Sequence, residues 1–325
     1  MTKLKKALKE YLSVRRAIGY KLLYDGSLLK EFVEFAEKEK APYITLKLAL
    51  KWATISKDTP PTAWARRLYA VRGFAKYQSA TDPRTQIPPK ELLPYRYHRN
   101  PPYIYTDTEI SKLIGAAKKL RSPRGLRAAT MSMIIGLLAV TGMRISETIN
   151  LDNEDVDLEH GILTISGTKF NKSRLVPVHI STRDELRRYA HLRDKICPKP
   201  KSTSFFISGR GTRFTAYMAR YWFVALSQQI GLRNPGDNHG PRLHDFRHRF
   251  TIKTMLGWYR SGINVEQNIM TLVTYLGHST VNNTYWYISA VPELLRLAAQ
   301  RLEKKGELTQ CLLNIHSPHC WSHSS

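Results

Sequence analysis

The residues best suited to chemistry lie in four short stretches in the second half of the chain. They are TGMRISE (141–147), TKFNKSRLVPV (168–178), LHDFRHRF (243–250) and LGHSTVNNTYWYISA (276–290). Arginine side chains suit the nonbridging oxygens of a phosphate and the charge that grows on them in a transition state. A tyrosine can act as a nucleophile, and a lysine can donate a proton to a leaving alkoxide. Together these side chains could attack a phosphodiester without a metal ion.

Each stretch also has an ordinary structural interpretation. Arg144 could simply pair with Glu147, because an arginine at the end of a buried helix needs a partner. A lysine in a turn is usually solvated, and a tyrosine on a helix usually packs. His244 and His248 are four residues apart and could share a metal ion, but LHDFRHRF lacks the further ligands and the glutamate of a zinc protease helix. Taken singly, the motifs leave these alternatives open.

Helical geometry separates residues within two of the stretches. His244 and Arg247 are three apart and would share one face of a helix, so both can reach one ligand. Residues two apart on a helix point about 200° away from each other. Tyr285 and Tyr287 therefore cannot face the same site, and one of them is expected to pack.

The ordered set of motifs resembles the tyrosine recombinase (phage-type integrase) family. The resemblance consists of TGMR, a lysine in a hairpin, HxxR, and LGHS with a tyrosine nine residues after its histidine, over roughly residues 105–290. Each motif alone is weak, whereas the set in this order is highly specific. The resemblance implies a mainly α fold: an N-terminal helical bundle (core-binding, SAM-like), then an α+β catalytic domain with a small antiparallel sheet.

The resemblance also implies a role for each matched arginine and histidine. Arg144 and Arg247 would clamp the scissile phosphate between them. His244 would assist proton transfer, and His278 would hydrogen-bond the same phosphate.

The lysines and the tyrosine complete the implied catalytic set. Lys169, the first lysine of TKFNKSR, would be the general acid for the leaving 5′ oxygen. Lys172 matches a second basic position, to which DNA contact is assigned. Tyr287 would be the nucleophile, with Tyr285 packed behind it.

The charge of the chain indicates a polyanionic partner. The 325 residues hold 51 Lys+Arg and 26 Asp+Glu, a formal net charge of +25. Residues 1–100 hold 21 basic and 9 acidic side chains, and residues 101–325 hold 30 and 17, so both halves are basic. So large a net positive charge makes the chain repel itself, and it is typical of proteins that bind nucleic acid. The three cysteines form no disulfide framework, which favours a reducing cytoplasm.

The pattern along the chain predicts two domains and their boundaries. Helical periodicity over residues 1–81 predicts a bundle of about four helices with Ser27 and Thr45 as N-caps. The proline-rich basic residues 82–105 are interpreted as a linker. Residues 106–303 form the predicted catalytic domain, which opens with a Thr106–Glu109 capping box and contains a β-hairpin. Residues 304–325 form a tail whose Cys and His residues fit no reliable zinc pattern.

Further basic residues are predicted to contact the DNA backbone. A charged solvent-exposed surface is the alternative for each of them. They are Arg66, Arg67, Arg72, Lys76, Lys172, Arg174, Arg210 and Arg213.

The resulting hypothesis is a site-specific DNA recombinase that forms a 3′-phosphotyrosyl intermediate and needs no cofactor, neither ATP nor metal. Its expected partners are double-stranded DNA sites and copies of itself, as a tetramer on two duplexes and a monomer or dimer when free. A cytoplasmic, nucleoid-associated location is expected, with no membrane association. The alternatives are a type IB topoisomerase, which reseals the same strand, and a DNA-binding regulator with a decayed site.

Overall fold

The computed structural model describes residues 2–56, 58–93, 102–166, 173–237, 240–277, 284–287 and 291–315, the residues 304–315 by their backbone alone. These residues form two compact units, one running up to Leu93 and the other beginning at Pro102. Both units are mainly helical, and the second contains a small antiparallel sheet, so the predicted fold class is confirmed. None of the described helices is long and apolar enough to cross a membrane.

The first unit is a helical bundle around an aromatic core. Phe32, Trp52 and Phe74 are at most 3% exposed and pack with the aliphatic side chains of the same helices. Among the described residues up to 93, the helices are α1 (Lys3–Ala17), α2 (Leu23–Lys38), α3 (Leu46–Ala53) and α4 (Pro61–Gln78).

Two predicted caps of this bundle have different outcomes. Thr45 caps α3 as predicted, accepting a hydrogen bond from Leu48 N at 3.1 Å. Ser27 was expected to begin the second helix, which is wrong, because α2 begins at Leu23 after a left-handed residue at Leu22. The Ser27 hydroxyl instead donates to Leu23 O within the helix at 3.2 Å. Asp25 in the first turn suits the positive end of the helix dipole and favours this earlier start.

Part of the predicted linker packs on the bundle. Gln86 N donates to Ile44 O at 2.8 Å, and the Gln86 side chain accepts from Leu46 N at 2.7 Å. Arg72 of α4 donates to Pro88 O. Residues 82–93 therefore lie against the first unit.

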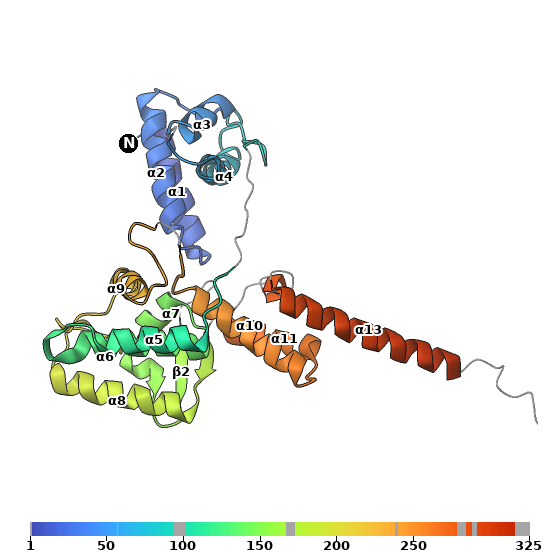
Figure 1. Ribbon diagram of the computed structural model, residues 1–325. Coiled ribbons are helices and arrows are strands. Elements are labelled where there is room, and N and C mark those ends of the chain that lie inside the picture. The colour runs from blue at the N-terminus through green and yellow to red at the C-terminus, as the bar shows by residue number, and fades with distance from the viewer. Residues whose placement is uncertain are drawn as a thin grey trace, which may run out of the picture. The chain divides into compact units, whose positions relative to one another are not determined.

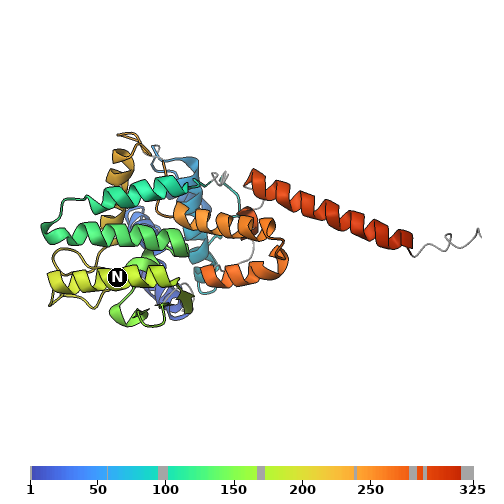
Figure 2. The same ribbon diagram turned by 60° about the horizontal axis from the view of Figure 1, so that its bottom comes forward.

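The second unit has a helical layer beside a three-stranded sheet. Figures 1 and 2 show α5, α6 and α8 running side by side. The sheet order is β1-β2-β3, both pairs antiparallel, with Leu163 opposite Val156 on one side and Val176 on the other. The predicted hairpin corresponds to β2 and β3, while the two-residue β1 was not predicted. The elements up to α8 are α5 (Asp107–Lys118), η1 (Pro123–Gly125), α6 (Leu126–Thr141), α7 (Ile145–Asn150), η2 (Asn153–Asp155), β1 (Val156–Asp157), β2 (Ile162–Ile165), β3 (Arg174–Pro177) and α8 (Ile180–Ile196).

The start of this unit is fixed by a cap and a ring stack. The Thr106 hydroxyl accepts from Glu109 N at 3.1 Å and the Glu109 carboxylate accepts from Thr106 N at 2.7 Å, so the predicted capping box is confirmed. The Tyr105 ring stacks on Phe246 at 4.3 Å, and its hydroxyl donates to Arg242 O. These contacts join the beginning of α5 to the beginning of α10.

The remaining named helices include α10, whose beginning carries His244 and Arg247. They are α9 (Ala216–Gln229), α10 (Asp245–Arg260), α11 (Val265–Leu276) and α13 (Pro292–Ile315). A second apolar cluster joins α10, α11 and the start of α13, and Tyr287 is part of it with Met255 and Leu294. In both views α13 begins near α10 and then runs outward (Figures 1 and 2).

Gly142 ends α6 in a conformation that other residues rarely adopt. Its φ is +62°, and a Cβ built on it would lie 2.7 Å from Phe250 Cδ1. We expect Gly142→Ala to lower the free energy of unfolding by about 2–3 kcal/mol through backbone strain and this clash. Gly136→Ala, in the interior of the same helix with no contact under 3.9 Å, is the matched control. Urea unfolding should show the control equal to or more stable than the wild type, and equal losses in both variants would contradict this account.

Candidate active site

The four described residues of the predicted catalytic set converge at the beginning of α10. His244 is the N-cap of α10, and Arg247 lies in its first turn. Arg144, the N-cap of α7, and the helical turn that carries Tyr287 are both close enough to Arg247 to influence its pKa. The structure thus brings together side chains from residues 144, 244, 247 and 287.

Arg247 is held by backbone carbonyls from two other segments. Its Nη1 donates to Gly142 O at 3.0 Å and its Nη2 donates to Leu276 O at 2.6 Å. The residue is 1% exposed. Burial, and after it the neighbouring charge of Arg144, lowers the pKa of Arg247 below its usual range. The two carbonyls partly compensate the cost of burying this cation and fix its orientation.

Arg144 is half-exposed and fixed by two partners. Its Nη1 donates to Glu147 Oε1 at 2.7 Å, and its Nη2 donates to Gly277 O at 3.1 Å. The structural pair with Glu147 that was one interpretation of TGMRISE is therefore present. The same pairing leaves the guanidinium partly open to solvent and able to receive an anion.

His244 lies beside this cluster as a neutral base. Burial lowers the pKa of His244, and the charge of Arg247 lowers it further. The ring is therefore unprotonated at neutral pH and can accept a proton.

The Tyr287 hydroxyl is paired with a histidine that the sequence analysis did not assign to the site. Tyr287 Oη lies 2.6 Å from His248 Nδ1, and the two residues are 1% and 6% exposed. On its other side, His248 Nε2 lies 3.9 Å from a carboxylate oxygen of Asp245. The signal was present in LHDFRHRF: His248 is one helical turn from His244 and three residues from Asp245, so it can face the same region.

Tyr285 and Tyr287 face different surroundings, as the helical geometry predicted. Tyr285 is 45% exposed, whereas Tyr287 is buried. The expectation that Tyr285 packs behind the site is wrong, because it lies at the surface beside Tyr259 and Arg301.

Three predicted site residues, Lys169, Lys172 and His278, lie outside the described residues, as do the tail residues from 316 onward. In the described part of the chain, no group of three or more His, Cys, Asp or Glu side chains could hold a metal ion. His244 and His248 have their rings 4.8 Å apart.

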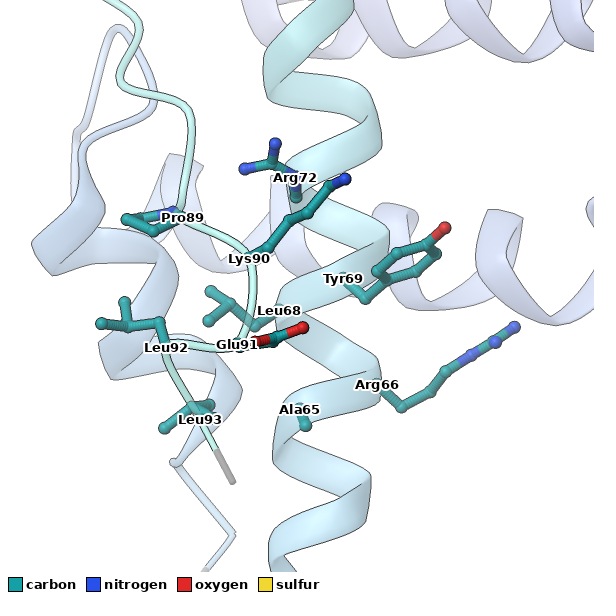
Figure 3. Close-up of a pocket in the computed structure, with 10 residues that line it drawn as sticks. All are labelled: Ala65, Arg66, Leu68, Tyr69, Arg72, Pro89, Lys90, Glu91, Leu92 and Leu93. Atoms are coloured by element: carbon teal, nitrogen blue, oxygen red, sulfur yellow. The ribbon is translucent and has the colours of Figure 1, made fainter. Parts of the chain in front are cut away.

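Two of the four α4 residues predicted to contact DNA line a cavity. Arg66 and Arg72, together with Tyr69, line a cavity of about 400 Å³, and Lys90 of the following segment lines it too (Figure 3). Arg66 also pairs with Asp25 at 2.6 Å.

The other residues predicted to contact DNA differ in their exposure and in their partners within the protein. Arg67 lies over the Trp52 ring at 5.4 Å, and Lys76 and Arg210 are exposed. Arg213 donates to Asp152 at 2.7 Å. Arg174 is bound to Glu147 and is only 10% exposed.

Glu147 makes the stability of this unit depend on pH. Burial raises its pKa, but hydrogen bonds from Arg174 and from Arg144 N outweigh burial and lower the pKa to about 2. A folded-state pKa below the usual 4.5 contributes stability that is present above pH 4.5 and is lost as pH falls towards 2. We expect the destabilisation caused by Glu147→Gln to be largest at pH 6–7 and to shrink as the pH approaches 3. Urea unfolding at pH 7, 5 and 3 measures it, and a pH-independent difference would contradict the assignment.

Comparison with known proteins places the chain in a family. Residues 104–293 match the phage integrase family. The putative integrase/recombinase y4rB of Sinorhizobium fredii (strain NBRC 101917 / NGR234) is 44% identical over 311 residues, covering 94% of this chain and 99% of the relative. Tyrosine recombinase XerC of Mycobacterium bovis (strain BCG / Pasteur 1173P2) is 25% identical over 303 residues, covering 91% and 97%.

A solved structure shows the same fold. The Tn1549 transposon integrase in complex with transposon right end DNA has a TM-score of 0.62 and 16% identity, covering 93% of this chain and all of the solved one. The chain belongs to the phage integrase family of tyrosine recombinases, the enzymes that cleave and rejoin DNA strands. Its function is site-specific recombination, and the predicted family and enzyme class are confirmed.

Proposed function

We propose that the chain exchanges strands between two DNA sites by transferring a backbone phosphate to Tyr287 and back. The observation that carries the proposal is the buried 2.6 Å contact between Tyr287 Oη and His248 Nδ1, beside the guanidinium groups of Arg144 and Arg247. A phenol in hydrogen bond with a histidine has a proton acceptor in place, which is what a tyrosine nucleophile needs.

In the first step, Arg144 and Arg247 hold the scissile phosphate and neutralise the charge that develops on it. Tyr287 Oη attacks phosphorus and its proton passes to His248. The bond to the 5′ oxygen breaks, Lys169 supplies a proton to that oxygen, and a 5′-hydroxyl is released. Because Tyr287 is 1% exposed, binding of DNA must make this hydroxyl accessible.

In the second step, a 5′-hydroxyl from the partner duplex attacks the phosphotyrosyl phosphorus. A new phosphodiester forms, the proton of the attacking hydroxyl passes to Lys169, and the Tyr287 oxygen leaves and regains its proton from His248. The bond energy is conserved in the adduct, so the reaction needs no ATP, and the arginines that neutralise the phosphate charge do the work for which a metal ion would otherwise be needed. His278 is assigned a hydrogen bond to the phosphate, and His244, neutral at pH 7, is assigned to proton transfer.

We also propose a domain arrangement and an assembly, both from the resemblance to the tyrosine recombinase family. The helical domain of residues 1–81 and the catalytic domain of residues 106–303 hold one duplex, and residues 82–105 connect them. Four protomers assemble on two duplexes, in the cytoplasm at the nucleoid, and the free protein is a monomer or dimer. The net charge of +25 supports DNA as the partner.

The proposal is tested with two labelled duplexes that carry a site selected by this protein from random-sequence DNA. With EDTA present and ATP absent, we expect recombinant strands that join one duplex to the other. Relaxation of a supercoiled plasmid without exchange between duplexes would instead support a type IB topoisomerase. Specific binding with no cleavage in either assay would support a regulator with a decayed site.

A further inference from the structure

Three arginines contact three successive carbonyls at the end of α11. Arg174 Nε donates to Tyr275 O at 2.8 Å, and Arg247 Nη2 donates to Leu276 O at 2.6 Å. Arg144 Nη2 donates to Gly277 O at 3.1 Å. The last carbonyls of a helix have no partners within the helix and carry the negative end of its dipole. The arginines therefore fix the chain direction immediately before residue 278.

Whereas the Arg144 side chain donates to only one carboxylate oxygen of Glu147, Arg174 holds both of those oxygens with its two remaining nitrogens. Its Nη2 donates to Glu147 Oε2 at 2.8 Å, and its Nη1 donates to Oε1 at 3.2 Å. The same carboxylate accepts from Arg144 Nη1 at 2.7 Å and from Arg144 N at 2.9 Å. Glu147 thus joins Arg174 to Arg144, and a forked pair of this kind restricts both side chains.

Burial and packing indicate that Arg174 serves the protein rather than DNA. The Arg174 side chain is 10% exposed and that of Glu147 is 7% exposed. Gly277, at φ +65°, lets the guanidinium pack closely, because a Cβ built there would lie 2.8 Å from Arg174 Nη1. Each of the three side-chain nitrogens of Arg174 donates to a partner within its own unit.

We propose that Arg174 is a positioning residue for catalysis. It sets the orientation of Arg144 through Glu147, and it anchors the end of α11 from which the chain continues to His278. This role replaces the direct contact with the DNA backbone that the sequence favoured for Arg174. The inference rests on the proposed function, in which Arg144 and His278 contact the scissile phosphate.

The experiment compares Arg174→Met and Arg174→Lys with the wild type. The matched control is Arg188→Met, at an arginine that is 71% exposed and pairs with Glu185. Cleavage is measured in a single turnover at saturating DNA, on a nicked suicide substrate that carries the selected site. Affinity is measured with each change placed in a Tyr287→Phe background, so that no cleavage disturbs binding.

We expect Arg174→Met to cleave about 100-fold more slowly, as misplaced catalytic groups do, with affinity changed by less than about 3-fold. Arg174→Lys should remain slow, because an ammonium cannot reproduce the fork to Glu147. On a substrate whose scissile phosphate is replaced by a neutral methylphosphonate, the cleavage rates of wild type and Arg174→Met should differ by less than about 10-fold. Less negative charge then develops in the transition state, so the orientation of Arg144 matters less. If Arg174→Met acted only by disturbing packing, it would slow cleavage by the same factor on both substrates.

Other results overturn the inference. In one such result, Arg174→Met cleaves normally at saturating DNA but binds more weakly, with a slope of log affinity against log salt that corresponds to about one phosphate contact fewer. That result would show that Arg174 contacts DNA directly. If Arg174→Met does not fold, Arg174→Lys decides the question, and wild-type cleavage by it would exclude a positioning role. If wild type and Arg188→Met also form no adduct, the proposed function has failed instead.

Discussion

Tyr287→Phe is expected to abolish the covalent protein–DNA adduct while leaving DNA binding intact. The phenol oxygen is the atom that the proposed reaction transfers to phosphorus, and nothing else at that position can replace it. Loss of a nucleophile in a preorganised site costs more than about 10⁴-fold in rate. The packing change is small, because the ring stays in the apolar cluster with Met255 and Leu294 while its hydroxyl no longer bonds to His248.

Tyr285→Phe is the matched control for this experiment. It removes the same hydroxyl from the same helical turn, but at a side chain that is 45% exposed and lies beside Tyr259. On a nicked suicide substrate, denaturing gels should show the adduct with Tyr285→Phe and none with Tyr287→Phe. The reverse pattern would assign the nucleophile to Tyr285.

Arg247→Lys is expected to have the second largest effect, a loss of about 10²–10³-fold in the cleavage rate at saturating DNA. Lysine keeps the charge but cannot donate to Gly142 O and Leu276 O while also reaching a phosphate. One of the two buried carbonyls then loses its partner, which also destabilises the unit by about 1–3 kcal/mol.

Arg249→Lys provides the control for that variant. Arg249 lies on the same helix, is 8% exposed, and donates to Tyr105 O and Asp107. Its replacement should destabilise the unit to a similar degree and leave the cleavage rate of the folded protein within about 3-fold of wild type, since its partners Tyr105 and Asp107 are not part of the predicted catalytic set. If both variants lose cleavage equally at matched stability, the special role of Arg247 is contradicted.

The sequence predicted the fold best where local rules act. The Thr106–Glu109 box and the Thr45 cap depend on side chains three residues from their partners, so they could be read directly. The start of α2 could not, because it depends on a left-handed residue at Leu22 that no propensity favours. Residues 82–105 were interpreted as a linker from their prolines, and the sequence did not indicate that Gln86 of this segment bonds to Ile44 and Leu46 of the bundle.

The site was predicted as a set of residues but not as a network. Motif order identified Arg144, His244, Arg247 and Tyr287, and the structure brings these four side chains together. The spacing within LHDFRHRF could place His248 near His244, but the pairing of His248 with Tyr287 spans 39 residues and could not be predicted from that spacing.

The arginine contacts to the end of α11 were also beyond the sequence. Arg174 reaches Tyr275 across 101 residues, and Arg144 reaches Gly277 across 133. A basic residue on a strand after a lysine-rich turn suggests an exposed cation when only its neighbours are known. Burial against Glu147 changes that interpretation.

Mapping the residue that becomes bonded to DNA tests the central claim most directly. The adduct trapped on a suicide substrate is digested with nuclease and protease, and the modified peptide is sequenced by fragment-ion mass spectrometry. The account predicts a nucleotide 3′-phosphate on Tyr287, with fragment ions that leave Tyr285 unmodified. A phosphate on any other residue, or a 5′-phosphate linkage, would contradict it.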